Sequence, residues 1–403
     1  VVCPEERVEP AQVPYVKDPT KVMMTKNSRD AHVRVEQRTL DLIQYAETSG
    51  INRIEECAEG SLVNGKKIGV ITSSTSYQYT KEVFGDKVSV LKLGMVYPLP
   101  EKLIKDFAQG KDEIYVIEEL DPIIENHCKQ LGIQVHGKDT FPICGEFSQN
   151  LIKKCMGMEE PEYTTIDAQI PGRPPVMCAG CPHRGIFYIL HKKKIMVYGD
   201  IGCYTLGAVA PLNAMDLNVC MGASCSGLHG FNKAMGEAGE SNSVGVIGDS
   251  TFMHSGMTGI TDISYNMSNS TVIILDNSIT GMTGHQQNPT TGKNLRGEPA
   301  GKVDLEALCR ALGFNRVRVV DPYDLAAVET AVTEELAAKE PSIIISRRPC
   351  VMIKQDACKG CKACMQIGCP AISFKDKKAH IDPTLCIGCE VCKQMCRFDA
   401  IGM

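Results

Sequence analysis

The sequence has no long apolar run and no marked excess of charge of either sign. No apolar stretch approaches the about 18 residues that a membrane-spanning helix needs. Lys and Arg number 43 against 48 Asp and Glu, which leaves a net charge of −5 at pH 7. This mildly acidic balance argues against nucleic acid or membrane lipid as the main partner. The 403 residues, 43% of them hydrophobic and 23% charged, fit an ordinary globular protein of two or three domains.

Cysteine, by contrast, is abundant and clustered. The chain has 20 cysteines, and its C-terminal part contains two C-x2-C-x2-C runs that are each followed by a fourth cysteine. This is the spacing of bacterial ferredoxins that hold two 4Fe–4S clusters, in which each run borrows its fourth ligand from the other. We therefore expect one cluster on Cys358, Cys361, Cys364 and Cys396, and the other on Cys386, Cys389, Cys392 and Cys369.

Structural zinc and disulfides are the alternatives for these cysteines. Zinc would need only one or two C-x2-C pairs, so the duplicated triple favours clusters. Two details depart from the usual pattern: Arg397 stands where proline normally follows the second run, and one extra residue precedes Cys369. Neither changes the number of ligands. Because cluster ligands must stay as thiolates, we expect a reducing compartment, the cytoplasm, and single-electron transfer.

The rest of the chain predicts two α/β domains between a linker and the ferredoxin module. Residues 1–20 are rich in proline and acidic residues and resemble an interdomain linker, so we expect the chain to be a fragment of a longer one. In residues 21–160 and 161–350, apolar strands alternate with helical periods, which predicts parallel sheets with crossover helices. The expected fold class is α/β, with two doubly wound parallel-sheet domains followed by a small α+β two-cluster ferredoxin module at 351–403.

Particular segments carry this expectation. In the first domain we expect strands at 67–72, 87–93 and 114–118, and helices at 99–109 and 122–131. In the second domain we expect strands at 195–198, 244–247, 271–275, 317–320 and 342–346, and helices at 257–266, 305–312 and 325–339. The cysteines of the first domain have no paired spacing and are expected to be buried hydrophobic residues; they are Cys57, Cys128, Cys144 and Cys155.

Polar residues follow two expected strands of the second domain. Gly248-Asp249-Ser250 follows one strand and Asp276-Asn277-Ser278 follows another, and the carboxyl ends of parallel strands are where open α/β sheets bind ligands. A carboxylate and an amide oxygen suit Mg²⁺ that also binds a diphosphate. Gly248 would let the diphosphate approach the backbone, and the next helix would offer its N–H groups.

This pattern is a weakened thiamine diphosphate motif, because Ser250 stands where that motif has glycine. Taken alone, Asp249 could be an ordinary helix N-cap. The polar, glycine-bearing loop at 282–291 is more than capping requires.

Further motifs appear in a specific order along nearly the whole chain. They are KDPTK near residue 17, SVLKLGMVYPLPEKLI at 89–104, CAGCPHR at 178–184, GDIGCYTLG at 199–207, MGAS at 221–224, GDSTFMHSG at 248–256 and MTGHQQNPTTG at 282–292. With these motifs and the ferredoxin tail, the chain resembles the alpha subunits of indolepyruvate ferredoxin oxidoreductases, within the 2-oxoacid:ferredoxin oxidoreductase superfamily.

The resemblance implies roles for particular residues. Asp249 and Asn277 would ligate Mg²⁺, with the backbone carbonyl of Ile279 as the third protein donor. The residues expected along the thiamine diphosphate are Gly248, Ser250, Met282 and Thr283. The residues expected near the substrate are His183, His229 and His254. Each of these histidines is equally well explained as an ordinary hydrogen-bonded core residue, although a proton carrier suits the chemistry.

The resemblance also implies an activity and partners. The expected reaction is the thiamine diphosphate-dependent oxidative decarboxylation of an aryl 2-oxo acid, such as indolepyruvate, to acyl-CoA and CO2. Electrons would pass through the clusters to ferredoxin, and a smaller beta subunit would be the partner in a hetero-oligomer. The glutamate that activates thiamine would come from a pyrimidine-binding domain that precedes the linker in such subunits, or from another chain. The alternatives are a non-oxidative thiamine-type decarboxylase and an electron-transfer subunit without catalysis.

A third cluster is a further implication. Related oxidoreductases bind a proximal 4Fe–4S cluster through ligands that here would be Cys178, Cys181, Cys203 and Cys350. Against this, Pro182 replaces the glycine that usually follows the pair, and buried cysteines without ligands are common.

Overall fold

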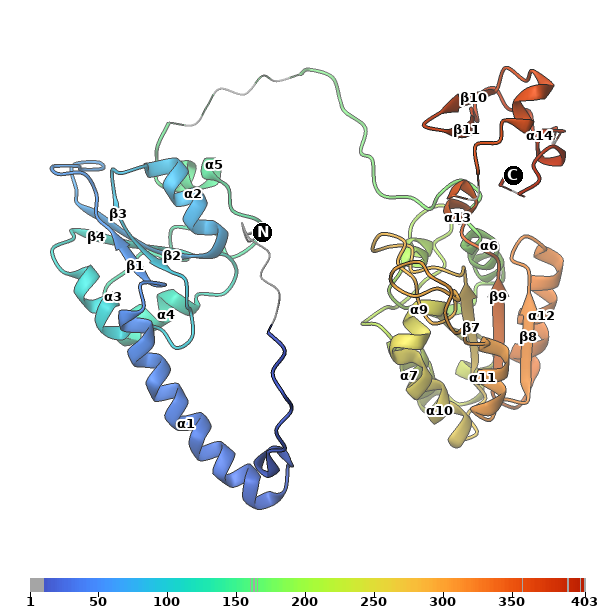
Figure 1. Ribbon diagram of the computed structural model, residues 1–403, viewed down its shortest axis with the longest axis horizontal. Helices are drawn as coiled ribbons and strands as arrows, with labels where there is room; N and C mark the ends of the chain where they lie inside the picture. Colours follow the sequence, from blue (N-terminus) through green and yellow to red (C-terminus); the bar gives the residue numbers. More distant parts are fainter. Residues whose placement is uncertain are drawn as a thin grey trace. The chain divides into compact units, whose positions relative to one another are not determined.

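The computed structural model describes residues 11–159, 161, 164, 166–356, 358–389, 391–398, 400 and 401, without the side chains of 354–356. The chain divides into two compact units, Val1–Gln169 and Ile170–Met403 (Figure 1). The predicted linker falls partly outside the described residues. Residues 11–18 have no regular structure, and a short 3-10 turn follows at Pro19–Lys21.

The first unit contains a four-stranded sheet with the order β1–β3–β2–β4. The predicted strands are confirmed, to within one or two residues at each end, as β2 (Ile68–Ser73), β3 (Ser89–Leu93) and β4 (Glu113–Ile117), and they are parallel. The sequence did not predict the short edge strand β1 (Arg53–Glu55), which runs antiparallel to β3.

Helices cover both faces of this sheet, so it is doubly wound (Figure 1). Helices α2 (Ser74–Phe84) and α5 (Gln149–Cys155) bury Phe84 and Ile152 against one face. Helices α3 (Glu101–Ala108) and α4 (Ile123–Gln130), both predicted, pack against the other. Successive side chains of a strand point to opposite faces, which is why the β2 sequence is apolar at consecutive positions.

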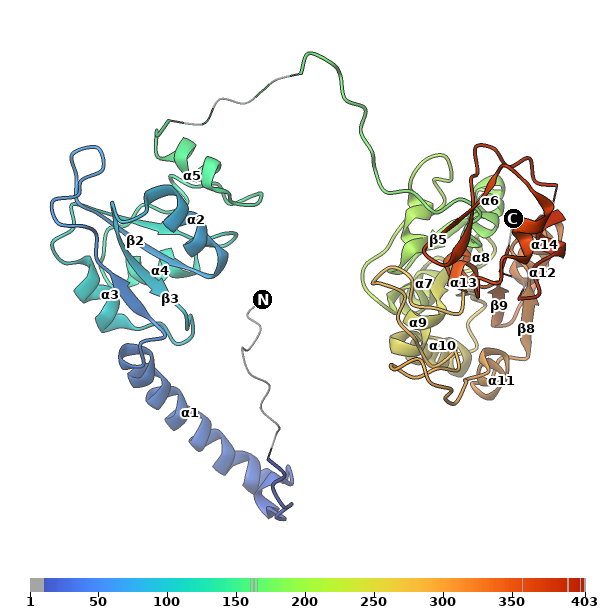
Figure 2. The same ribbon diagram turned by 45° about the horizontal axis from the view of Figure 1, so that its top comes forward.

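The sequence did not reveal the longest helix, α1 (Thr25–Thr48). It extends from the sheet of its unit as a rod (Figure 2), and Ala46 is its only buried residue. The helix is attached near its C-terminal end, where the Glu47 carboxylate accepts the N–H groups of Lys102 and Leu103 at 2.8 Å each. The apolar side chains of α1 form no buried face within this unit, and Val33, Leu40 and Ile43 are exposed.

Of the four cysteines expected to be buried in this unit, only Cys128 is. Cys57 and Cys155 are half-buried, and Cys144 is exposed, so the expectation is wrong for Cys144. Cys144 lies in the segment between α4 and α5, which contributes no strand or helix to the layers that bury Cys128.

The second unit contains a fully parallel five-stranded sheet with the order β5–β6–β7–β9–β8. All five predicted strands are confirmed; they are β5 (Met196–Tyr198), β6 (Ser243–Gly248), β7 (Thr271–Asp276), β8 (Arg316–Val320) and β9 (Ser342–Arg347). Every residue of β6 and β7 is buried.

Helices again cover both faces of the sheet. One face carries α6 (His183–Lys193) and α12 (Leu325–Ala337). The other carries α7 (Ala223–Met235), α10 (Met257–Tyr265) and α11 (Leu305–Ala311). Shorter turns connect them: η2 (Cys203–Ala208), α8 (Glu237–Glu240), α9 (Asp249–Thr251) and the π-helical turn η3 (Phe252–Gly256).

The C-terminal segment is small and mixed, as predicted for a ferredoxin module. Helix α13 (Val351–Asp356) is followed by η4 (Ala363–Ile367), the antiparallel hairpin β10 (Ile372–Lys375) and β11 (Lys378–Ile381), and α14 (Val391–Gln394). Across the described part of the chain, no helix is long and apolar enough to cross a membrane.

Glycine sets how closely α6 approaches the loop before α12. A Cβ on Gly185 would lie 1.9 Å from the carbonyl oxygen of Pro322, whereas a Cβ on Gly230 of α7 would meet nothing within 4 Å. We predict that Gly185→Ala lowers the free energy of unfolding by roughly 1–3 kcal/mol, because backbone must move. The control Gly230→Ala should raise it by up to about 1 kcal/mol, because alanine favours the helix. Urea unfolding followed by circular dichroism measures both, and equal effects would contradict the close approach.

Candidate functional site

The candidate site is built on the carboxyl ends of β6 and β7. These strands are parallel, and Gly248 is in register with Leu275. Asp249 therefore follows β6 at the same edge of the sheet where Asn277 follows β7. Both side chains are buried, Asp249 to 2% exposure and Asn277 to 7%. The structure thus brings together the two residues that the motif proposes as metal ligands.

The Asp249 carboxylate is compensated only by hydrogen bonds. It accepts the N–H of Ser250 at 2.7 Å and the hydroxyl of Thr290 at 3.1 Å. Burial, followed by the negative charge of Asp276, raises the pKa of Asp249 to about 7. A buried carboxylate is costly unless it is paired or binds a metal. This donor chemistry fits Mg²⁺, a hard cation that prefers oxygen.

Asn277 makes three contacts that fix it in place. Its Nδ2 lies 3.3 Å from Nε2 of His183, and its Oδ1 accepts the N–H of Ile279 at 3.2 Å. Its backbone carbonyl accepts the N–H of Cys350 at 2.9 Å. Asn277 is therefore the residue where the candidate metal site meets two cysteine-bearing segments, one before α6 and one after β9.

The loop after β7 returns over the site. The Thr280 hydroxyl donates a hydrogen bond to Oγ of Ser250 at 2.7 Å. Thr290 is only 2% exposed, and its hydroxyl donates a hydrogen bond to the Asp249 carboxylate. The predicted cofactor residues Met282 and Thr283 lie on the exposed part of this loop. Sequence reasoning missed Thr290, although it falls in the polar segment that was singled out.

Gly248 also has a steric reason within the chain. A Cβ there would lie 2.7 Å from the Tyr204 ring, so glycine makes room for an aromatic side chain of the chain itself. Its expected role of making room for a diphosphate stays a prediction. Burial raises the pKa of Tyr204, whose hydroxyl donates to the carbonyl of Ile201 at 3.1 Å.

The three candidate histidines lie in different environments. His183 is only 4% exposed, and its ring packs edge-to-face on Tyr204. Burial lowers the pKa of His183 to about 4. His229 of α7 lies 3.5 Å from the Asp262 carboxylate of α10. His254 is exposed on the π-helical turn and contacts Ser255 at 3.0 Å. Only His183 contacts a candidate metal ligand, and the catalytic roles of all three stay predictions.

Asp200 is a further site residue that sequence reasoning missed. It is fully buried at the end of β5, and its carboxylate accepts the N–H groups of Ile201 at 2.8 Å, Gly222 at 2.8 Å and Ser224 at 3.3 Å. The side chain thus fixes the loop before Cys203 to the start of α7. The signal was present, because a Gly-Asp pair follows β5 as one follows β6.

Four cysteines from three segments gather near Asn277. Burial is the main cause that raises the pKa of the Cys181 thiol to about 11, and the neighbouring thiols of Cys350, Cys178 and Cys203 contribute to this rise. Burial also raises the pKa of Cys203, with Cys350 and Cys178 adding to it. The structure thus places in one neighbourhood the four thiols proposed for a third cluster.

Side chains of the same unit support the turn that carries the first two of these cysteines. Arg184 donates to the carbonyl of Cys178 at 3.1 Å and also to that of Met177. The Tyr323 hydroxyl donates to the carbonyl of Gly180, and the Arg348 guanidinium stacks 3.7 Å from the Tyr323 ring centre. The turn therefore has defined partners on α6 and in the loops after β8 and β9.

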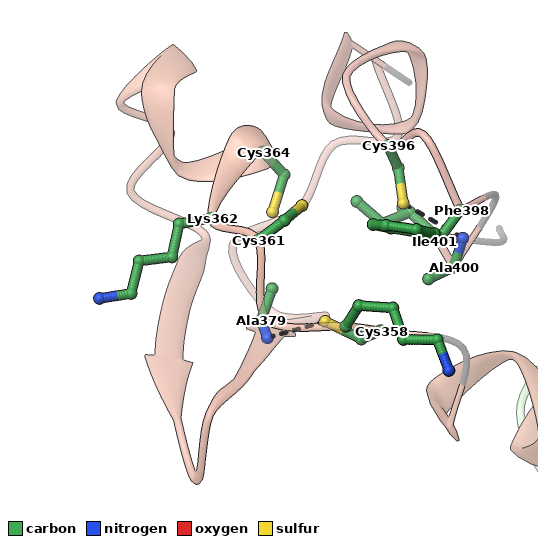
Figure 3. A pocket seen from close by; sticks show the side chains of 10 residues that line it. Cys358, Cys361, Lys362, Cys364, Ala379, Cys396, Phe398, Ala400 and Ile401 are labelled. Atoms are coloured by element: carbon green, nitrogen blue, oxygen red, sulfur yellow. Dashed lines mark hydrogen bonds between the residues drawn. The ribbon is translucent and has the colours of Figure 1, made fainter.

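In the C-terminal module, one predicted ligand set lines a single hollow (Figure 3). Its cysteines are Cys358, Cys361, Cys364 and Cys396. Two sulfurs accept backbone N–H groups, Cys358 from Ala379 at 3.4 Å and Cys396 from Ala400 at 3.2 Å. The N–H groups of Ala379 and Gly360 lower the pKa of Cys358, which favours the thiolate that a cluster requires.

The second predicted set is brought together in part. Cys386 and Cys389 lie near Cys392, whose pKa is raised by burial and by these two neighbours. Cys369 packs with Cys392 and Cys396 around the small core of the module. Among the described residues, no three Cys, His, Asp or Glu side chains stand in metal-binding geometry, so the ligand sets remain proposals.

Comparisons with known protein families match two separate parts of the chain. Residues 200–346 match the model of the thiamine pyrophosphate enzyme C-terminal TPP binding domain. Residues 379–402 match the 4Fe-4S binding domain. The first match contains Asp249 and Asn277 and the second contains the last four cysteines. The chain therefore contains a thiamine diphosphate-binding domain and a 4Fe–4S binding domain.

Curated relatives match nearly the whole chain. It is 34% identical to indolepyruvate oxidoreductase subunit IorA of Thermococcus kodakarensis, over 96% of this chain and 67% of that protein. It is 34% identical to IorA of Pyrococcus horikoshii, over 83% of this chain and 60% of that protein. It is 32% identical to IorA of Archaeoglobus fulgidus, over 95% of this chain and 66% of that protein.

The chain thus spans about two thirds of the length of the curated relatives it matches. Among solved structures, the chain is similar to a 2-oxoglutarate:ferredoxin oxidoreductase from Magnetococcus marinus. The match covers 45% of this chain and 66% of that chain, at 17% identity and a TM-score of 0.39. The identity to the curated relatives decides the family: the chain belongs to the indolepyruvate oxidoreductase IorA subunits.

Proposed function

We propose that this chain binds thiamine diphosphate through Mg²⁺ and passes electrons from a 2-oxo acid to iron–sulfur clusters. One observation carries the proposal: the backbone carbonyl of Asn277, a candidate metal ligand, accepts a hydrogen bond from the backbone N–H of Cys350, a member of the four-cysteine group. A thiamine enzyme that only decarboxylates needs no electron acceptor beside its cofactor. The shared residue therefore favours oxidative over non-oxidative decarboxylation.

The residues present divide into roles. Asp249, Asn277 and the carbonyl of Ile279 would hold Mg²⁺. Bound thiamine diphosphate would supply the electron sink that a 2-oxo acid needs to lose CO2. Thr290 hydrogen-bonds to Asp249, and the Thr280–Ser250 pair fixes the loop beside it. Buried surroundings on β6 and β7 exclude water from these oxygens, which strengthens their hold on a cation.

Electrons would leave through cysteine-bound clusters. The proposed proximal 4Fe–4S cluster is held by Cys178, Cys181, Cys203 and Cys350. The proposed tail clusters are held by two sets, Cys358, Cys361, Cys364 and Cys396, and Cys386, Cys389, Cys392 and Cys369. Thiolate ligands of this kind suit a reducing compartment, so we also propose a cytoplasmic location.

The substrate and partners are proposals from the relatives' names. An indolepyruvate oxidoreductase acts on indolepyruvate, so we propose an aryl 2-oxo acid as substrate, coenzyme A as acyl acceptor and ferredoxin as electron acceptor. The word subunit supports a second polypeptide, the beta subunit, in a hetero-oligomer. Assays of the assembled complex with aryl, branched and short 2-oxo acids test the substrate class. Equal rates with all three would contradict an aryl preference.

The metal assignment predicts the effect of Asp249→Ala. Loss of the carboxylate should weaken Mg²⁺-dependent thiamine diphosphate binding by more than about 100-fold, because even supporting residues of metal sites cost 10–100-fold. Iron content should not change. Isothermal titration calorimetry measures the affinity, and Asp106→Ala, at an exposed position of α3 in the first unit, is the control. Unchanged affinity in Asp249→Ala would remove Asp249 from the site.

The tail assignment predicts the effect of Cys361→Ala. Two clusters contain about eight irons, and loss of one ligand should release about four of them. Iron analysis and EPR of protein purified without oxygen measure this, with Cys144→Ala, an exposed cysteine of the first unit, as the control. Stoichiometric zinc in place of iron would instead support the structural-zinc alternative.

The proposed proximal cluster predicts a higher total iron content than the two tail clusters alone. The full chain purified without oxygen should contain about twelve irons, and Cys203→Ala should lower this by about four. Cys220→Ala, an exposed cysteine outside the group, should keep the full content. A wild-type content near eight irons that Cys203→Ala leaves unchanged would show that the four thiols are only neighbours.

A further inference from the structure

His183 lies between the candidate metal site and the four-cysteine group. It begins α6, two residues after Cys181, and it is only 4% exposed to solvent. One side of the ring packs edge-to-face on Tyr204, with ring centres 5.9 Å apart. Its Nε2 faces Nδ2 of Asn277 at 3.3 Å. The imidazole therefore has a fixed position, and its Nε2 is occupied by the contact with Asn277.

The chemistry of the two groups sets the direction of this hydrogen bond. An amide nitrogen can only donate, so Nε2 of His183 must accept. The N–H of Ile279 donates to the other end of the same amide, Oδ1, at 3.2 Å. The N–H of Ile279 thus selects the orientation of an amide whose two ends have nearly equal size, and His183 supports the same orientation in the tautomer whose Nε2 carries no proton.

This orientation matters for a cation. Only the oxygen of an Asn side chain can ligate Mg²⁺, and the amide nitrogen would face it if the group rotated by half a turn. Rotation would place the NH2 group against the N–H of Ile279, which is a repulsive contact. It would also require His183 to change tautomer, because Nε2 would then have to donate to Oδ1.

We propose that His183 is a positioning residue that holds the amide of Asn277 with its oxygen available to Mg²⁺. The inference rests on the proposed thiamine diphosphate function. It places His183 in a different role from that of a proton carrier, because the ring is enclosed and its Nε2 is already used. A group of this kind acts through Asn277 and contacts no substrate.

Calorimetric titration of the full chain with thiamine diphosphate and Mg²⁺ tests the proposal. His183→Leu should weaken binding about 10- to 100-fold, the range for residues that support metal ligands. His183→Gln retains an acceptor oxygen near the position of Nε2 and should stay within about threefold of wild type. His191→Leu makes the same substitution at the exposed end of α6 and should have no effect. Circular dichroism and iron content report whether each variant is folded.

A double variant tests whether His183 acts through Asn277 or independently of it. Asn277→Ser keeps a hydroxyl near the metal but cannot reach His183, so adding His183→Leu to it should weaken binding by no more than about twofold. Full additivity of the two substitutions would show that His183 acts independently of Asn277.

Three outcomes overturn the proposal. The first is wild-type affinity in His183→Leu. The second is equal loss in His183→Leu and His183→Gln when both are folded, because the imidazole itself would then be required. The third is additivity in the Asn277→Ser background. Failure of the wild-type chain to bind thiamine diphosphate with Mg²⁺ would instead remove the proposed function, and this inference with it.

Discussion

The burial of oxygen ligands at the ends of β6 and β7 is the constraint on which the second unit depends. A parallel sheet covered on both faces brings successive strand ends to one edge, and at this edge Asp249 is almost without solvent. A buried carboxylate must be compensated, and two hydrogen bonds from Ser250 and Thr290 do this only in part. The raised pKa of Asp249 expresses the remaining cost. A cation bound at this edge would remove that cost, so the energetics of the fold and the binding of the cofactor point to the same site.

A second buried carboxylate shows the other solution to the same problem. Asp200 follows β5 as Asp249 follows β6, but it accepts three backbone N–H groups, two of them at the start of α7. These donors also carry the partial positive charge of a helix N-terminus, which stabilises the charged form. Two Gly-Asp pairs on neighbouring strands thus have opposite roles. Asp200 fixes the loop that carries Cys203, while Asp249 stays available to an external ligand.

Sequence reasoning predicted what depends on local pattern. The eight strands and five helices predicted by residue range lie within one or two residues of their observed bounds. The strands were predictable because buried parallel strands are continuous apolar runs. The cysteine spacing led to a ligand set whose four members line one hollow. What it missed depends on contacts distant in sequence: Thr290 reaches Asp249 across 41 positions, and His183 reaches Asn277 across 94. Helix α1 was also missed; it packs little against the rest of its unit, since Ala46 is its only buried residue.

Electron transfer provides the reason why a thiamine site and a cysteine group should share a residue. Electrons move one at a time from a carbon centre only if an acceptor lies close by, and each added bond in the path slows them. Asn277 offers a path of a single hydrogen bond, from its carbonyl to the N–H of Cys350. Its amide is held in turn by His183, which follows Cys181 by two residues. A change in the proximal cysteine turn would therefore move a candidate metal ligand, and the converse also holds. Under the proposed function, these contacts would link the candidate metal ligand to the cysteine segments, a link that a site used for decarboxylation alone would not need.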